Sequence, residues 1–188
     1  ISLHTGGSER VRIDNQGRLM IGTTTEGQGD ADNLTLYDSG NCGLTIRSSN
    51  VGWGVINFSD STSGAGEYDG FINYSQQHQY LKLGTASVER LRITSAGDVG
   101  IGTVTPGGDL HIWDDDSSAR IYITSGNSDD ASIYFGRAND TATAAIRNDH
   151  SDNSLRFYGY NNSERLRIDS NGDVGIGTDT VNTTNGAV

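Results

Sequence analysis

Apolar and polar residues alternate in short runs along this chain. The clearest runs are LHIW from Leu110, ARIYITS from Ala119, SIYF from Ser132 and SLRFY from Ser154. A period of two residues puts neighbouring side chains on opposite faces of a β-strand, so each run predicts a strand with one buried face. Clusters of Gly, Asn, Asp and Ser, such as SGNSDDA and NDHSDNS, separate the runs and predict turns. No stretch has a helical period, so the pattern predicts an almost purely β architecture.

A phrase of fifteen residues occurs three times. It reads ERVRIDNQGRLMIGT from Glu9, ERLRITSAGDVGIGT from Glu89 and ERLRIDSNGDVGIGT from Glu164. Shorter runs repeat as well: LTLYD matches LHIWD, GLTIRSS matches ARIYITS, VINF matches SIYF, and YLKLG matches SLRFY. Self-similarity at a nearly constant period indicates a repeat protein. The matches predict residues 1–33 as the end of one unit, 34–109 as a second unit, and 110–188 as a third unit with an atypical end.

Each copy of the phrase predicts a β-hairpin. A type I turn with glycine in the left-handed conformation gives a three-residue loop with a bulge, and Gly17, Gly97 and Gly172 stand at the glycine position. This register places aliphatic pairs on one face of every hairpin. The expected pairs are Ile13 with Leu19, Val11 with Ile21, Ile93 with Val99, Leu91 with Ile101, Ile168 with Val174, and Leu166 with Ile176.

On the other face of the hairpins, arginines are expected to lie opposite glycines. The pairs are Arg92 with Gly100, Arg90 with Gly102, Arg167 with Gly175, and Arg165 with Gly177. Glycine leaves room there for the arginine stems or for another backbone. Met20 replaces one of these glycines in the first copy. Glu9, Glu89 and Glu164 are expected to pair with arginine from a neighbouring strand or chain, so we interpret all these residues as structural.

The composition leaves little material for a core within one chain. Glycine makes up 26 of the 188 residues, about twice the usual share of roughly 7%. Only 39 residues are Ile, Leu, Val or Phe, close to the roughly one-fifth level below which a charged chain is expected to be disordered. Because the sequence alternates too regularly for a disordered chain, we expect burial to come from outside the single chain.

Charge and apolar patterning narrow the range of partners. The net charge is −11, and the chain has one lysine, Lys82, and no cluster of basic residues. This distribution argues against nucleic acid as a partner. No apolar run approaches the roughly 20 residues that a membrane span needs, and no signal peptide is recognisable, so we expect a soluble segment cut from a longer polypeptide. The lone Cys42 is expected to be a small, half-buried side chain without a reactive role.

The repeats resemble those of tailed-bacteriophage tail fibres. The resemblance lies in ERLRIDSNGDVGIGT and in GIGTVTPGGDLHI, and it covers both full repeats and the leading partial one. In that family such repeats often precede an intramolecular chaperone that cuts itself off. The resemblance implies an extracellular, elongated homotrimeric fibre of short antiparallel strands and hairpins, intertwined or packed about a common axis. It also implies other virion tail proteins as partners. The end TDTVNTTNGAV lacks the proline and the LHI strand, so we expect shaft rather than tip.

Candidate binding residues are few. Outward-pointing aromatic rings stack on pyranose faces, or they fill an interface and brace neighbouring strands. The candidates for host-glycan contact are Trp53, Trp113, Tyr134 and Tyr158, with Tyr37, Tyr122 and Tyr160 in similar positions. The acidic run Asp114–Asp116 and the stretch DSNGD from Asp169 read as turns rather than calcium loops. The scattered histidines suggest no metal site.

Neither catalytic motifs nor cofactor motifs are recognisable. GIGT lacks the lysine of a phosphate-binding loop and opens no helix. We therefore expect no enzymatic activity and no cofactor, with a virion structural protein as the leading interpretation. A polysaccharide-binding module, a polysaccharide depolymerase and a cellular adhesin or filament repeat remain as alternatives.

Overall fold

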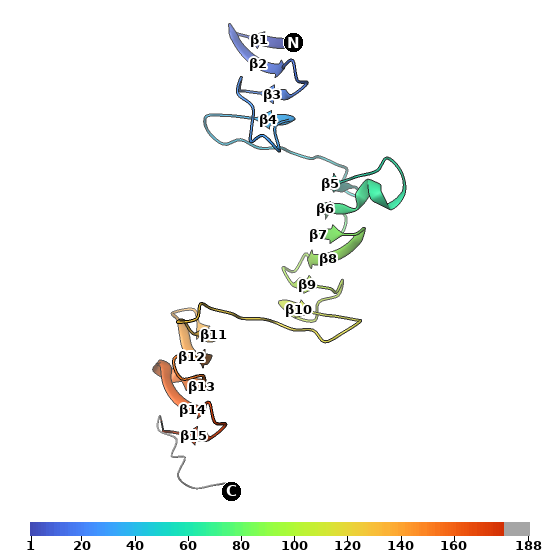
Figure 1. Cartoon of the computed structure of the whole chain (residues 1–188). Helices are drawn as coiled ribbons and strands as arrows, with labels where there is room; N and C mark the ends of the chain where they lie inside the picture. Colours follow the sequence, from blue (N-terminus) through green and yellow to red (C-terminus); the bar gives the residue numbers. More distant parts are fainter. Residues whose placement is uncertain (179–188) are drawn as a thin grey trace. The chain divides into compact units, whose positions relative to one another are not determined.

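The computed structural model describes residues 1–178, and these residues form three β-sheets (Figure 1). The chain divides after Ser118 into two compact units, which are described separately below. The helical segments among the described residues are two short 3-10 helices, Gly64–Tyr68 and Tyr160–Asn162. None of the described helical segments is long and apolar enough to cross a bilayer. The predicted all-β class is confirmed.

The first unit contains two of the sheets. The first sheet has four strands, β1 (Ser2–Thr5), β2 (Ser8–Ile13), β3 (Leu19–Ile21) and β4 (Leu34–Leu36). The second sheet has six, β5 (Trp53–Phe58), β6 (Gly70–Ser75), β7 (Tyr80–Thr85), β8 (Val88–Ile93), β9 (Val99–Ile101) and β10 (Leu110–Ile112). Within each sheet the strands lie in chain order, so sequence neighbours are also spatial neighbours.

The second unit contains the third sheet. Its strands are β11 (Ala131–Arg137), β12 (Asp140–Asp149), β13 (Ser154–Gly159), β14 (Ser163–Ile168) and β15 (Val174–Ile176), again in chain order. The atypical end, TDTVNTTNGAV, lies outside the described residues apart from Thr178.

The three predicted hairpins form with the expected register. Ile13 pairs with Leu19, Ile93 with Val99, and Ile168 with Val174, each in an antiparallel ladder. Gly17, Gly97 and Gly172 have φ of 83°, 97° and 89°. Each donates its N–H to the carbonyl three residues earlier, which closes the predicted turn. Glycine is required here because other residues are strained at positive φ.

The strands LTL and LHI complete a preceding sheet. β4 pairs in parallel with β3, and β10 pairs in parallel with β9. The sequence matches place both strands at the start of a repeat unit, whereas each of them ends its sheet. The repeat period does not depend on where a unit is taken to begin.

Two predicted strands do not form within the chain. GLTIRSS (43–49) and ARIYITS (119–125) alternate like the other runs, but neither is part of a sheet. Their side chains are exposed, with Leu44 and Ile121 each 67% accessible. A strand needs a hydrogen-bonding partner as well as an alternating pattern, and none lies beside these segments in the described chain.

Candidate assembly surfaces

Each sheet has one continuous aliphatic face. Directly paired residues share a face, so the ladder defines the face across all strands. In the second sheet this aliphatic face consists of Ile56, Ile72, Leu81, Leu83, Leu91, Ile93, Val99, Ile101, Leu110 and Ile112. In the third sheet it includes Ile133, Ile146, Phe157, Leu166 and Ile176, which pair in sequence across all five strands.

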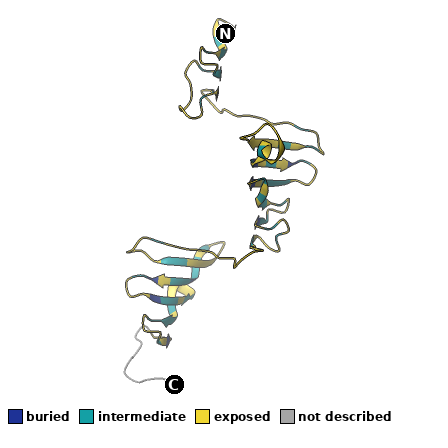
Figure 2. Ribbon diagram, turned by 45° about the vertical axis from the view of Figure 1, so that its right-hand side comes forward, coloured by how far each residue is buried: buried dark blue, intermediate teal, exposed yellow. Residues whose placement is uncertain are grey.

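The aliphatic faces are largely uncovered within one chain. Ile101 is 40% accessible, Ile133 45% and Ile176 77%. Among the described residues only Met20, Phe71 and Ala145 are buried apolar side chains. Figure 2 accordingly shows intermediate and exposed colours over most of every sheet. The aliphatic faces are therefore not buried within the single chain, because a sheet needs a second packed layer to bury a face.

A bulge places the repeated Glu and Arg side chains on one face. Residues three apart in a regular strand point to opposite faces. The β7–β8 ladder jumps from Leu91 to Glu89, so Arg90 is an extra residue that restores the shared face. Arg92 can therefore donate to Glu89, with Nε–Oε1 at 2.7 Å and Nη2–Oε2 at 2.9 Å.

The same arrangement recurs in the other two sheets. Arg12 pairs with Glu9, and Arg167 pairs with Glu164, both through two hydrogen bonds. The expectation that these glutamates pair with arginine of a neighbouring strand or chain is therefore wrong, because the main partner of each is the arginine three residues later on its own strand. Glu164 has a second partner on a neighbouring strand, since Arg156 on β13 lies 3.6 Å from it. The repeated spacing E-x-x-R in a strand, an odd separation, was the sequence signal for the bulge.

The glycines opposite the arginines make room for backbone. A Cβ atom on Gly100 would lie 2.4 Å from the carbonyl oxygen of Thr103, and one on Gly102 would lie 2.1 Å from that of Trp113. Arg92 does lie opposite Gly100, as predicted. Gly175 likewise pairs with Arg167 in the third sheet. Of the two predicted reasons for glycine, close backbone approach applies at Gly100 and Gly102.

The outer two arginine–glycine pairs lie beyond the ladder. Gly102 donates its N–H to the Arg90 carbonyl at 3.0 Å, and Gly177 donates to the Arg165 carbonyl at 2.9 Å. The Arg90 side chain is exposed and donates to Thr85 Oγ1. Arg90 and Arg92 therefore have different surroundings, since Arg92 pairs with Gly100 in the ladder and Arg90 is the bulge residue.

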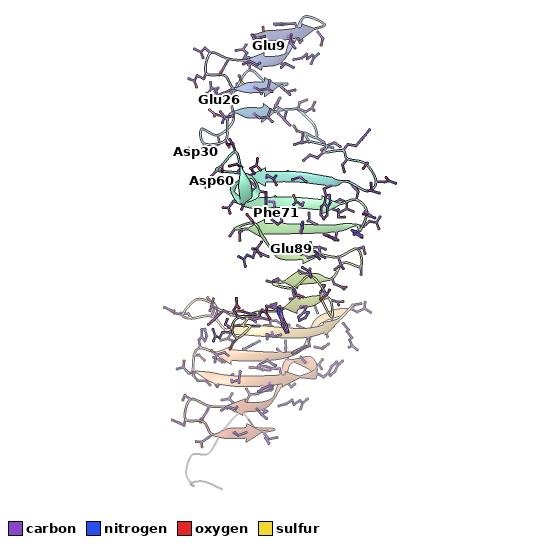
Figure 3. The ribbon with its side chains drawn as sticks, turned by 90° about the vertical axis from the view of Figure 1, so that its right-hand side faces the viewer. Glu9, Glu26, Asp30, Asp60, Phe71 and Glu89 are labelled. Atoms are coloured by element: carbon purple, nitrogen blue, oxygen red, sulfur yellow. The ribbon has the colours of Figure 1, made fainter. Side chains whose placement is uncertain are left out.

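Cations and aromatic rings cover the opposite face of the second sheet. Lys82 Nζ lies 4.8 Å from the centre of the Trp53 ring and 5.1 Å from that of Phe71. Arg92 lies 4.0 Å above Tyr80, whose ring also meets Trp53 edge-on. Figure 3 labels Phe71 and Glu89 within this sheet. Such contacts contribute about 0.5–1 kcal/mol each at exposed sites, so this face is stabilised within the chain.

The four candidate glycan-contact residues do not form one site. Trp53 lies beneath Lys82 in the second sheet, and Trp113 follows β10, is 52% accessible and meets His111 edge-on. Tyr134 and Tyr158 do come together in the third sheet, where both contact Arg147. Trp53 and Tyr158 each contact a cation on another strand of the same sheet, as expected for side chains that brace the sheet. Trp113 and Tyr134 keep about half of their surface exposed.

Three arginines lie side by side on the opposite face of the third sheet. Arg147, Arg156 and Arg167 are direct neighbours in the ladder. Like charges placed opposite one another are destabilising. Carboxylates offset this repulsion at Asp130, Asp149, Asp152 and Glu164, each within 4 Å of an arginine nitrogen. Four acids surround three arginines, so this cluster offers no net positive charge to an anionic ligand.

We expect the stability of the third sheet to depend on pH through Asp149. Hydrogen bonds from Ser151 and the charge of Arg156 hold the pKa of Asp149 below its ordinary value, although burial acts in the opposite direction. A carboxyl whose pKa is lower in the folded state stabilises the fold above its unfolded pKa of about 3.9. That contribution is lost as the pH falls through the lower, folded value.

Urea unfolding of the natural chain and the Asp149→Asn variant at pH 7, 5 and 3 would measure this effect. The natural chain should be more stable at pH 7 and 5, and the difference should shrink at pH 3. A difference that stays constant down to pH 3 would contradict the assignment.

The acidic candidate segments form turns. Asp114 Oδ1 accepts the N–H groups of Asp116 and Ser117, and Asp169 Oδ1 accepts those of Asn171 and Asp173. Among residues 1–178 no cluster of three His, Cys, Asp or Glu side chains is placed to hold a metal ion. Cys42 is exposed rather than half-buried and lies in the stretch between β4 and β5.

Comparison with protein-family models and with curated proteins found no match for this chain. The function is therefore inferred from the surfaces themselves and from the resemblance of the repeats.

Proposed function

We propose that the chain is a shaft segment of a homotrimeric tail fibre of a tailed bacteriophage. In this role it connects other tail proteins in the extracellular part of the virion and supports attachment to the host, without catalysing a reaction. The observation that carries the proposal is the aliphatic face of each sheet, which stays uncovered in a single chain.

Assembly would bury these faces. Apolar surface gains roughly 25 cal/mol for every Å² removed from water, and each sheet presents its aliphatic residues on one side only. Copies related by a rotation axis can turn that side inward, while the arginine, glutamate and aromatic groups of the opposite face remain outside. The number three comes from the resemblance of the repeats.

The oligomeric state tests the proposal directly. Sedimentation equilibrium of the whole chain at micromolar concentration should give three times the chain mass of 20.0 kDa. Circular dichroism of the same sample should show β-structure. A well-folded monomer at that concentration would contradict the proposal. Immunogold labelling of intact virions with antibodies to this segment would then locate it on the fibre.

A further inference from the structure

Two segments of the chain have the pattern of strands but no pairing partner. They are residues 43–49 (GLTIRSS) and 119–125 (ARIYITS), called here the unpaired segments. Among the described residues no backbone hydrogen bond is made by residues 43–47 or 119–124. Tyr122 is 80% accessible and Ile123 45%. In the single chain only solvent is available to the N–H and C=O groups of these residues, whereas a strand satisfies them through a neighbouring strand.

The unpaired segments occupy equivalent places in the repeat. Each follows the parallel strand that ends one sheet, β4 or β10, and each precedes the first strand of the next sheet, β5 or β11. The two sequences also match one another in the pattern of apolar residues. Because the arrangement occurs twice, we interpret the unpaired segment as a regular part of the repeat and not as an irregularity of one loop.

The strands that follow the unpaired segments have open edges. β5 pairs only with β6, and β11 pairs only with β12. Proteins usually protect an open edge with charges, proline or bulges. The sequence of β5, WGVINF, contains no charge or proline. In β11, ASIYFGR contains one charge, Arg137, and the ladder has one register irregularity, just before Arg137 at the end of the strand. The lengths also agree, since β5 and β11 have 6 and 7 residues and each unpaired segment has seven.

The first unpaired segment does not cover the edge of its own β5. Ile46 lies over the face of β5, where a Cβ atom on Gly54 would be 3.8 Å from Ile46 Cγ2. Gly54 pairs with Tyr74 and shares the side of the sheet on which Leu81 lies. The segment therefore passes across the aliphatic face and leaves the hydrogen-bonding edge open.

We infer that the unpaired segments become strands on the open edges of a second copy of this chain. Residues 43–49 would pair with β5 of a neighbouring copy, and residues 119–125 with its β11. Leu44 and Ile46 would then extend the aliphatic face beside Ile56, as Ile121 and Ile123 would beside Ile133. Each copy carries both segments and both edges, so cyclic exchange covers the β5 and β11 edges of every copy when the ring closes.

This inference rests on the proposed trimer and goes beyond it. A trimer can form from chains that only pack side by side, or from chains that exchange strands. Strand exchange predicts that the copies are linked by backbone hydrogen bonds as well as by apolar contacts.

Hydrogen exchange in the assembled full-length chain tests the inference. Every second amide within residues 44–47 and 120–124 should exchange about 100-fold or more slowly than the turn amides of Asn127 and Ser128, because alternate N–H groups of an added edge strand point toward the partner. Tyr122→Pro and Ile123→Pro are tested as single variants, because the N–H group of one of these two residues points toward the partner strand. The variant that removes that N–H group should weaken assembly. Asn127→Pro is the matched control, since it occupies the second position of the Gly126–Asp129 turn, where proline is favoured.

Photo-cross-linking distinguishes exchange from pairing within one chain. Benzoylphenylalanine in place of Tyr122 should give dimers on a denaturing gel, with the link mapped to residues 131–137 of another copy. A trimer whose segment amides exchange freely overturns the inference but leaves the trimer intact. Protected amides with links only inside one chain also overturn it. A monomeric chain overturns both proposals.

Discussion

Ile56→Asp is expected to abolish trimer formation, whereas Val55→Asp is expected to preserve it. The two residues are neighbours on β5 and have similar accessibility in the single chain, 42% and 39%. They differ in the face that they occupy. Ile56 pairs with Ile72 on the aliphatic face, and Val55 pairs with Asn73, next to Lys82 on the opposite face.

The expected difference follows from burial in the proposed trimer. A carboxylate left buried without a partner costs about 3–5 kcal/mol, and a trimer would contain three of them. At position 55 the new carboxylate would remain in solvent close to a cation. Sedimentation equilibrium of both variants, with circular dichroism to confirm that the strands persist, measures the effect. Equal behaviour of the two variants would show that the aliphatic face is not the interface.

Gly102→Ala is expected to destabilise the second sheet by more than about 3 kcal/mol, and Gly97→Ala by only about 1 kcal/mol. Both glycines have positive φ, 75° and 97°, so both variants include backbone strain. Only Gly102 also faces a close backbone, because its Cβ would lie 2.1 Å from the Trp113 carbonyl oxygen. The hydrogen bond from Trp113 N–H to the Ile101 carbonyl, 2.9 Å, holds that backbone in place.

Tryptophan fluorescence during urea unfolding can measure this difference. The chain has two tryptophans. Trp53 is the first residue of β5 and Trp113 directly follows β10, so the fluorescence signal reports on the second sheet. The Gly97→Ala variant is the control for positive φ alone, since its Cβ meets open space. Similar losses in both variants would mean that the parallel strand β10 contributes little.

The hairpins were predictable from the sequence because their determinants are local. The glycine at Gly97 and the aliphatic residues on both sides of it fix the turn and the register over about ten residues. The bulge at Arg90 was less apparent, although the odd spacing of Glu89 and Arg92 indicated it. The long strand β12 was missed because TATAAIRND contains mostly small residues, whose alternation is weak.

Other features could not be derived from sequence periodicity. The close approach of Trp113 to Gly102 depends on a parallel strand that returns after a loop, and periodicity carries no information on that return. The run ARIYITS has a strand pattern, yet a pattern does not say which chain supplies the partner. The resemblance of the repeats suggested a fibre, and the uncovered aliphatic faces give that suggestion a physical reason.

The chain-order arrangement of every sheet has a consequence for folding. Each strand from β5 to β10 pairs with the one next to it in sequence, so most contacts close short loops. Folding rates rise as the sequence separation of contacts falls. Each meander can therefore form soon after its residues leave the ribosome, before another copy arrives. In the proposed trimer, the slow, concentration-dependent step is then the encounter between chains.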